Sequence, residues 1–383
     1  MQVNKIIRIF FIVFISGLAG KKLEGKDTNP YRQFRFIEIK GHSGSHYYSG
    51  ESLSDALKNG YRAVEVRYGW QSNNPDGWQS KYRYPGYGVG WYSGFIGDPN
   101  VLGMPGALYG FISFPLFQFR RHEIGLEPAF GISYDLNPYD EENNSDNDAI
   151  GSRFNVYFNL NLGGRYRITR EIDLLYGLDI THLSNGRTYL PNSGLNMFGP
   201  NLGIRYNFNA RQNKIDNSPN PTKILDVRPV LDTYRKAMPV SEYSLLFYMA
   251  TGLVQDREHK GSNKQYSTFS SILEGQYKFT EKSAISLGFD AFYDSSLKIS
   301  FPDHSVDFYG AHLGYDFMFW KMAIRMQGGT YLHQKARNFK GSYFLRPALK
   351  FDLSRVVYFQ LGLKTQNGFI ADWVEYGLGI RLF

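Results

Sequence analysis

Cysteine is absent from the 383 residues of this chain. Its absence excludes a disulfide framework, thiolate catalysis, a cysteine-based zinc site and a lipid-modified N-terminal cysteine. The chain also lacks a G-x-S-x-G nucleophile elbow, a phosphate-binding loop and an H-E-x-x-H zinc motif. We therefore expect neither a metal site nor a bound cofactor.

Long apolar runs are missing after residue 20, so the sequence contains no candidate transmembrane helix. Before that point, Lys5 and Arg8 precede the apolar run IFFIVFI, and small residues follow it up to Gly20. The run is too short to span a bilayer, and the pattern predicts a secretory signal peptide over residues 1–20. A mean hydropathy of -0.38 is compatible with a transmembrane barrel, because a barrel hides its apolar residues in alternation with polar ones.

Strand-like alternation fills most of the remaining chain. From Arg35 onward, about sixteen segments alternate apolar residues with small or charged ones. Short turns near residues 168, 280 and 354 alternate with longer polar loops at 137–151, 255–265, 333–342 and 365–372. Long loops on one rim and short turns on the other are typical of outer-membrane barrels. We therefore predict an all-β fold, a single closed antiparallel transmembrane β-barrel of about 14 to 16 strands over residues 30–383.

Two long segments fit this prediction poorly, because they fall on the rim of short turns. They are residues 72–86 and residues 210–241. The second segment has prolines at positions 219, 221, 229 and 239 among charged residues, which favours a linker or plug-like insert. The first segment leaves the earliest strands uncertain, so fourteen strands stay an alternative to sixteen.

The stretch from residue 171 to residue 208 carries the chemistry. It reads as two alternating strands joined by a loop, and His182 and Ser184 fall on the apolar face of the first strand. Two residues apart on a strand, an imidazole and a hydroxyl point to the same side, as a general base and its nucleophile require. Asn196 joins the apolar face of the second strand. The alternative reading of His182 is a barrel histidine at the level of the lipid headgroups.

A family resemblance rests on this stretch. The residues His182, Leu183, Ser184, Asn185 and Gly186, followed by Pro191, Asn192, Ser193, Gly194, Leu195 and Asn196, resemble the signature of the outer-membrane lipid A 3-O-deacylases, also called acyloxyacyl hydrolases. The resemblance implies an esterase in the cell outer membrane, whose site faces the lipid of the outer leaflet. It also implies that the substrate is an ester-linked acyl chain of lipid A, the membrane anchor of lipopolysaccharide.

The same resemblance assigns roles to individual residues. Ser184 becomes the nucleophile, His182 the general base and Asn185 the oxyanion stabiliser, while Asn192 belongs to the substrate-binding loop. Gly194 falls in that same loop, and Arg187 is placed to meet a phosphate of the substrate. Asn196 stands where the family has a glutamate. An amide can hold the imidazole's tautomer but cannot compensate the imidazolium charge, so we expect about a few kcal/mol less transition-state stabilisation.

Other partners and a rival function complete the expectations. Phe383 supplies the C-terminal aromatic residue typical of substrates of the outer-membrane assembly machinery. Nucleic-acid binding is not expected, because the excess positive charge is scattered through strand ends and turns. The oligomeric state is left open. The rival to a deacylase is a non-catalytic barrel, either a pore or a degenerate relative that kept the motif for structure.

Overall fold

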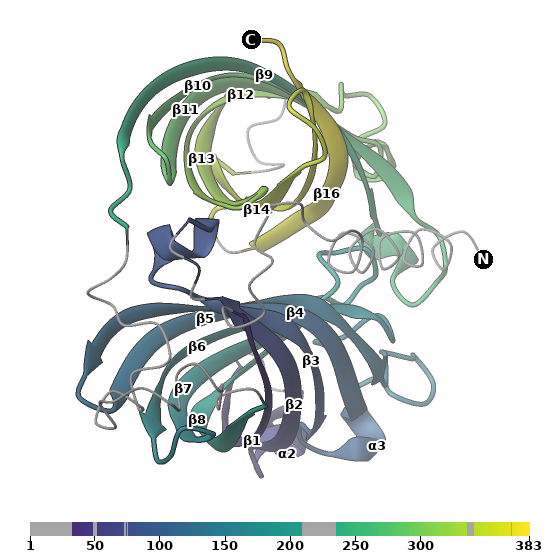
Figure 1. The fold of residues 1–383 in the computed structure, drawn as a ribbon. Helices are drawn as coiled ribbons and strands as arrows, with labels where there is room; N and C mark the ends of the chain where they lie inside the picture. The colour runs from purple at the N-terminus through teal and green to yellow at the C-terminus, as the bar shows by residue number, and fades with distance from the viewer. Residues whose placement is uncertain are drawn as a thin grey trace, which may run out of the picture.

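Two closed antiparallel barrels of eight strands each form the described part of the chain. The structure is a computed structural model that describes residues 33–48, 52–72, 74, 76–208, 235–334, 341–368 and 370–383. In Figure 1 the first barrel, purple to teal, lies below the second, green to yellow. None of the described helices is long and apolar enough to cross a membrane.

The first barrel closes by pairing its last strand with its first. Register partners across this seam run from Phe36 with Asn207 to Tyr47 with Asn196. Its strands are β1 (Gln33–Tyr47), β2 (Tyr61–Ser72), β3 (Gly86–Phe95), β4 (Gly103–Phe119), β5 (His122–Leu136), β6 (Asn155–Arg167), β7 (Ile172–Ser184) and β8 (Leu195–Asn207). Its short helices are α2 (Ser54–Leu57), η2 (Trp78–Tyr82) and α3 (Pro99–Leu102).

The second barrel closes in the same way, by pairing β16 with β9. The pairing starts with Tyr376 opposite Thr251 and continues through the residues that follow Tyr376. Its strands are β9 (Pro239–Val254), β10 (Tyr266–Thr280), β11 (Ser283–Asp294), β12 (Asp307–Phe319), β13 (Met322–Gln334), β14 (Tyr343–Asp352), β15 (Val357–Gln366) and β16 (Ile370–Arg381). Its short helices are η5 (Arg257–His259) and α5 (Leu297–Ser300).

The prediction of one barrel of 14 to 16 strands is wrong, because sixteen strands are divided between two eight-stranded cylinders. Alternation and turn length are local features, and they are the same in one large cylinder as in two small ones. The deciding interaction is the pairing of β8 with β1, which joins residues far apart in the sequence. The predicted signal peptide over residues 1–20, and all of the predicted insert over residues 210–241 except residues 235–241, lie outside the described residues.

Paired polar side chains fill both barrel interiors. In the first barrel, His42 lies between Asp179, 2.7 Å from Nδ1, and Glu65, 3.1 Å from Nε2. In the second, His312 lies in the same way between Asp290, at 2.8 Å, and Glu274, at 3.1 Å. Buried charges of this kind are stable only when they are paired and hydrogen-bonded.

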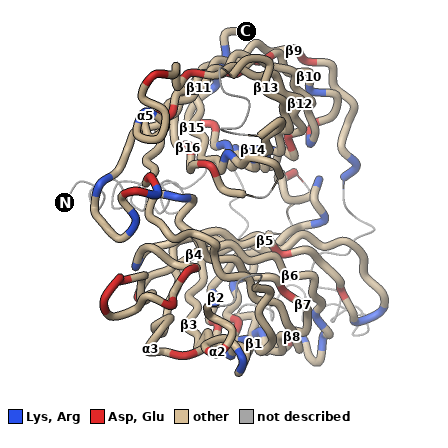
Figure 2. Tube along the Cα trace, turned by 180° about the vertical axis from the view of Figure 1, so that it is seen from behind, with Lys and Arg blue, Asp and Glu red and all other residues tan. Residues whose placement is uncertain are grey.

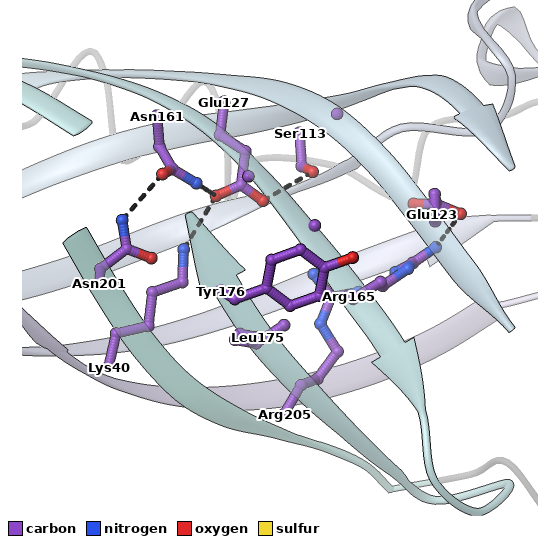
Figure 3. Close-up of a pocket in the computed structure, with 13 residues that line it drawn as sticks. Lys40, Ser113, Glu123, Glu127, Asn161, Arg165, Leu175, Tyr176, Asn201 and Arg205 are labelled. Atoms are coloured by element: carbon purple, nitrogen blue, oxygen red, sulfur yellow. Dashed lines mark hydrogen bonds and ion pairs between the residues drawn. The ribbon is translucent and has the colours of Figure 1, made fainter. Parts of the chain in front are cut away.

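A small polar pocket remains inside the first barrel. Figure 3 shows Lys40 and Asn161 meeting at the carboxylate of Glu127, with nitrogen–oxygen distances of 2.8 and 2.9 Å. Ser113 donates a hydrogen bond of 2.9 Å to the other oxygen of Glu127. The charged groups lining this pocket therefore already have protein partners.

The outer walls of both barrels are apolar. Leu178 and Leu202 on the first barrel and Leu287 and Leu313 on the second are each at least 60% exposed. Charged residues of both signs are found in the loops at the barrel ends (Figure 2). An apolar band between polar ends is what a membrane-spanning barrel presents to lipid.

The two barrels contact each other at both ends, with like rims together. At the short-turn rim, η2 lies between the barrels (Figure 1), where Lys81 pairs with Glu281 and the hydroxyl of Tyr82 donates to the carbonyl of Met318. The ring of Trp78 there packs 6.4 Å from that of Phe319. Segment 72–86 fitted poorly as a short turn because it forms this contact. At the long-loop rim, the loop between β7 and β8 contacts the second barrel, so both barrels run side by side in the same direction.

Candidate active site

His182 and Ser184 lie at the end of β7, on the outer face of the first barrel. Leu178 and Ile180 on the same face are 64% and 55% exposed, whereas Asp179 and Thr181, of opposite parity, are buried in the interior. The period-2 geometry of the strand accounts for this placement. The one carboxylate near in sequence, Asp179, points into the interior and bonds His42 instead.

Three of the predicted residues form one hydrogen-bonded chain. The Nε2 atom of His182 lies 2.9 Å from Oγ of Ser184, and its Nδ1 atom lies 2.7 Å from Oδ1 of Asn196. His182 and Asn196 are direct register partners on β7 and β8. With the proton on Nδ1, the imidazole donates to the amide oxygen, and Nε2 is left to accept from the hydroxyl. This tautomer is the one in which a histidine can deprotonate a serine.

The loop over residues 185–194 covers Ser184, the predicted nucleophile, which is only 6% exposed. The backbone N–H of Asn185 donates to Oδ1 of Asn192 at 2.8 Å, and Oδ1 of Asn185 accepts from the backbone N–H of Tyr189 at 3.2 Å. The Nδ2 atom of Asn185 donates to Oγ of Ser152 at 3.2 Å. Asn185 and Asn192 thus hold the loop in shape, and their contacts with substrate stay predictions.

Gly194 closes the loop directly against the imidazole. Its φ of 74° lies in the left-handed region, which favours glycine. A Cβ at this position would lie 2.8 Å from Cε1 of His182 and 3.1 Å from the carbonyl oxygen of Leu183. The absence of a side chain here therefore leaves the imidazole in its place, and a direct substrate contact of Gly194 stays a prediction.

Arg187 is bound to the second barrel. Its Nη2 atom lies 2.9 Å from Oδ2 of Asp294 and 3.5 Å from Oγ of Ser296, and Nη1 lies 3.9 Å from Oδ1 of Asp372. Burial disfavours the charged guanidinium, but the carboxylates of Asp294 and Asp372 outweigh it and raise the pKa of Arg187. These contacts give no support to the expectation that Arg187 meets a substrate phosphate.

Sequence reasoning missed two glutamines of the second barrel that hold the same loop. Oε1 of Gln255 accepts from the backbone N–H of Leu190 at 2.7 Å, and the backbone N–H of Gln255 donates to the carbonyl of Arg187 at 3.0 Å. Nε2 of Gln265 donates to the carbonyl of Thr188 at 3.0 Å. No local signal in the sequence points to these contacts, because they join residues 65 and 77 positions apart across two barrels.

Comparison with known families gives one match on each barrel. Residues 62–205 match the family described as lipid A 3-O-deacylase (PagL), and residues 242–383 match the family described as acyloxyacyl hydrolase, C-terminal domain. Together with the barrel fold, these matches define an outer-membrane enzyme that hydrolyses ester bonds. The chain belongs to the lipid A 3-O-deacylase family, and lipid A deacylation is the activity which that membership supports.

Other comparisons add little. No curated protein matches the chain in sequence. Among solved structures, the siderophore receptor PirA from Acinetobacter baumannii is 11% identical with a TM-score of 0.23, and the match covers 88% of this chain and 56% of PirA. OccAB3 from Acinetobacter baumannii is 9% identical with a TM-score of 0.22, over 91% of this chain and 98% of its own. OccK11 (OpdR) from Pseudomonas aeruginosa is 9% identical with a TM-score of 0.22, over 92% and 96%. Scores at this level do not define a shared arrangement of strands.

Proposed function

We propose that the first barrel removes an ester-linked acyl chain from lipid A in the outer leaflet, by a Ser/His mechanism at its lipid-facing wall. The observation that carries this proposal is the hydrogen-bonded chain Ser184–His182–Asn196 on the outer face. A nucleophile, its base and a group that orients the base are the parts that acyl transfer by serine requires. The family to which the chain belongs supplies the substrate class.

The first half of the reaction forms an acyl-serine. Nε2 of His182 takes the proton of Ser184 as Oγ attacks the ester carbonyl carbon, and the carbonyl oxygen becomes an oxyanion. The imidazolium keeps its Nδ1–H bond to Asn196 and then gives the new proton to the departing sugar oxygen. The bond between the acyl carbon and that oxygen breaks, so the sugar leaves as an alcohol and the acyl chain stays on Ser184.

Water completes the cycle through the same two residues. His182 takes a proton from a water molecule, which attacks the acyl carbon, and returns the proton to Oγ of Ser184 as a fatty acid leaves. We assign stabilisation of the oxyanion to Asn185, whose Nδ2 carries two hydrogens, one of them directed at Ser152. In this role Asn185 serves both the loop and the transition state.

The position of the site means that the proposed reaction needs no deep pocket for the acyl chain. An acyl chain of lipid A already lies in hydrocarbon beside an apolar outer wall, where Leu178 and Phe198 are 64% and 49% exposed. Its ester lies at the headgroup boundary, where β7 ends with Ser184. The substrate therefore reaches the nucleophile by diffusing in the plane of the membrane.

A pore is not favoured by the described interiors. In the second barrel, Arg325 pairs with Glu274 and Asp316, and Arg346 pairs with Asp290 at 2.8 Å. Side chains that neutralise each other across a narrow eight-stranded cylinder occupy the space that a channel needs. The described interior of the second barrel therefore does not favour a pore.

The test uses the full chain purified in detergent and mixed with lipid A. Fatty acid released over time is measured for the wild type, Ser184→Ala and His182→Ala. We expect release to fall to background in both variants, because each removes a group that moves the proton or attacks the ester. Ser193→Ala is the matched control, since that serine lies on the same loop and its hydroxyl donates to the carbonyl of Asp148 rather than to His182. Release by Ser184→Ala at the wild-type rate would overturn the mechanism.

A further inference from the structure

We propose that the second barrel positions the catalytic loop of the first, and that Gln255 and Asp294 are the positioning residues. The inference rests on the proposed function of Ser184 and His182 in the first barrel. It assigns a role in catalysis to a domain that contains no part of the hydrogen-bonded chain described above. Three independent contacts support it, and all fall on the loop over residues 185–194.

The first contact fixes the backbone of the loop. Gln255 follows the last residue of β9, is 1% exposed, and bonds the loop twice. Its side-chain oxygen accepts from the backbone N–H of Leu190 at 2.7 Å, and its own N–H donates to the carbonyl of Arg187 at 3.0 Å. Its Nε2 atom donates to the carbonyl of Ser262 at 2.7 Å, which fixes the orientation of the amide. A buried amide with both ends bonded has one arrangement available, so it defines the position of the loop.

The second contact anchors the loop by charge. Asp294 is the last residue of β11, is fully buried, and accepts from Nη2 of Arg187 at 2.9 Å. Its other oxygen accepts from the backbone N–H of Ser296 at 2.9 Å, so the carboxylate is itself held in place. Arg187 lies three residues after the nucleophile and has a φ of 68°, in the left-handed region. The ion pair holds the loop in a conformation that the chain alone disfavours.

The third contact is a close steric fit. Gly186, two residues after Ser184, has a φ of 62° and lies flat against the outer wall of the second barrel. A Cβ on Gly186 would lie 2.4 Å from Cγ2 of Val374 and 3.5 Å from Cδ1 of Leu363. The loop is therefore seated on β15 and β16 without a gap. A shift of the second barrel would therefore move this loop, which contains Gly194 and Asn185, the proposed oxyanion donor.

An ion pair between the barrels at the opposite rim provides a control. It distinguishes positioning of the loop over residues 185–194 from a general stabilisation of the two-barrel molecule. Lys81 of the first barrel pairs with Glu281 of the second, at the short-turn end of both barrels. This ion pair also joins the barrels, but it lies at the rim opposite the loop over residues 185–194. If the second barrel serves only to stabilise the molecule, loss of either ion pair should have the same effect on activity. If it positions the catalytic loop, only the pair at the long-loop rim should affect the chemical step.

The experiment compares Gln255→Ala, Asp294→Asn, Gln255→Glu and Glu281→Gln in the full chain. Folding is checked by the shift of the unheated band in denaturing gels. For each variant, kcat and KM are measured on lipid A, together with the rate at which an alkyl organophosphonate modifies Ser184. A displacement of about 1 Å costs up to about a hundredfold in rate. We therefore expect Gln255→Ala and Asp294→Asn to lower kcat and the modification rate by roughly ten- to a hundredfold, with little change in KM.

Two variants make the result specific. Gln255→Glu keeps an oxygen for the backbone N–H of Leu190 but loses the donor to the carbonyl of Ser262, so its rates should lie between those of Gln255→Ala and the wild type. Glu281→Gln should keep both rates at the wild-type level. Wild-type rates in folded Gln255→Ala and Asp294→Asn would overturn the inference while leaving the Ser/His mechanism intact, and an equal loss in Glu281→Gln would overturn it as well. Modification of Ser184→Ala by the phosphonate at the wild-type rate would instead refute the proposed function on which it rests.

Discussion

The Nδ1 atom of His182 lies 2.7 Å from the amide oxygen of Asn196, its register partner on the neighbouring strand. The resembling family signature has a carboxylate at this position. The amide oxygen accepts the same hydrogen bond and selects the same tautomer of the imidazole, but it adds no negative charge beside the imidazolium that the proposed mechanism requires. The chain therefore has the geometry of a catalytic triad with weaker electrostatic support.

Substitution of Asn196 tests whether its amide oxygen orients His182 and whether the missing charge lowers the rate. Asn196→Ala removes the acceptor for Nδ1–H, and the loss of one such bond, about 1–3 kcal/mol, lowers kcat by roughly ten- to a hundredfold. Asn196→Glu adds the missing charge and is expected to raise kcat above the wild-type value by up to roughly a hundredfold, the rate equivalent of a few kcal/mol. Fatty-acid release from lipid A measures both effects. Equal kcat in Asn196→Ala and the wild type would show that the amide does not orient His182.

Gly194→Ala should disable the site without unfolding the barrel. The added methyl group would lie 2.8 Å from Cε1 of His182, so the imidazole has to move away from Ser184. The control is Gly261→Ala, at a glycine with a φ of 79° whose Cβ would come no closer than 3.4 Å to Tyr139. Both variants carry the same backbone strain, about 1–2 kcal/mol, but only Gly194→Ala should lose activity. Loss of activity in both would attribute the effect to loop strain instead.

The arrangement of the barrels in the membrane predicts a labelling pattern. The chain has no cysteine, so each introduced cysteine is the only thiol. Glu142→Cys in the first barrel and Ser262→Cys in the second lie on long loops, and both should react with an impermeant maleimide on intact cells. Arg120→Cys and Lys321→Cys lie on short turns and should react only after lysis. Labelling of Lys321→Cys on intact cells would mean that the second barrel runs in the opposite direction to the first.

The interior ion pairs predict where the second barrel is most easily destabilised. Arg346 is fully buried, lies 2.8 Å from Oδ1 of Asp290 and 2.9 Å from Oε2 of Glu375. Arg346→Ala leaves Glu375 without its cation and leaves Asp290 dependent on its bond to His312. It should cost about 3–5 kcal/mol of unfolding free energy, measured by urea unfolding in detergent. Lys278→Ala breaks an exposed pair with Glu242 and should cost less than about 1 kcal/mol. Equal costs would mean that water reaches Arg346 inside the barrel.

The sequence predicts the individual strands and the faces on which their side chains lie. It does not predict which strands distant in the sequence pair with each other. Alternation in β7 and β8 placed His182, Ser184 and Asn196 on one face, and the structure joins them by two hydrogen bonds. The same alternation contains no information on whether β8 pairs with β1 or continues into a larger cylinder, so the division into two barrels was missed. The contacts of Gln255 and Asp294 with the loop over residues 185–194 were not predicted, for the same reason.

Mass spectrometry of lipid A from cells that make either the wild-type chain or Ser184→Ala tests the central claim most directly. We expect lipid A from wild-type cells to contain a species lighter by one ester-linked acyl chain, and lipid A from cells making a comparable amount of folded Ser184→Ala to lack it. The same species at the same abundance in both strains would contradict the account, because the hydroxyl facing His182 would then have no part in the reaction.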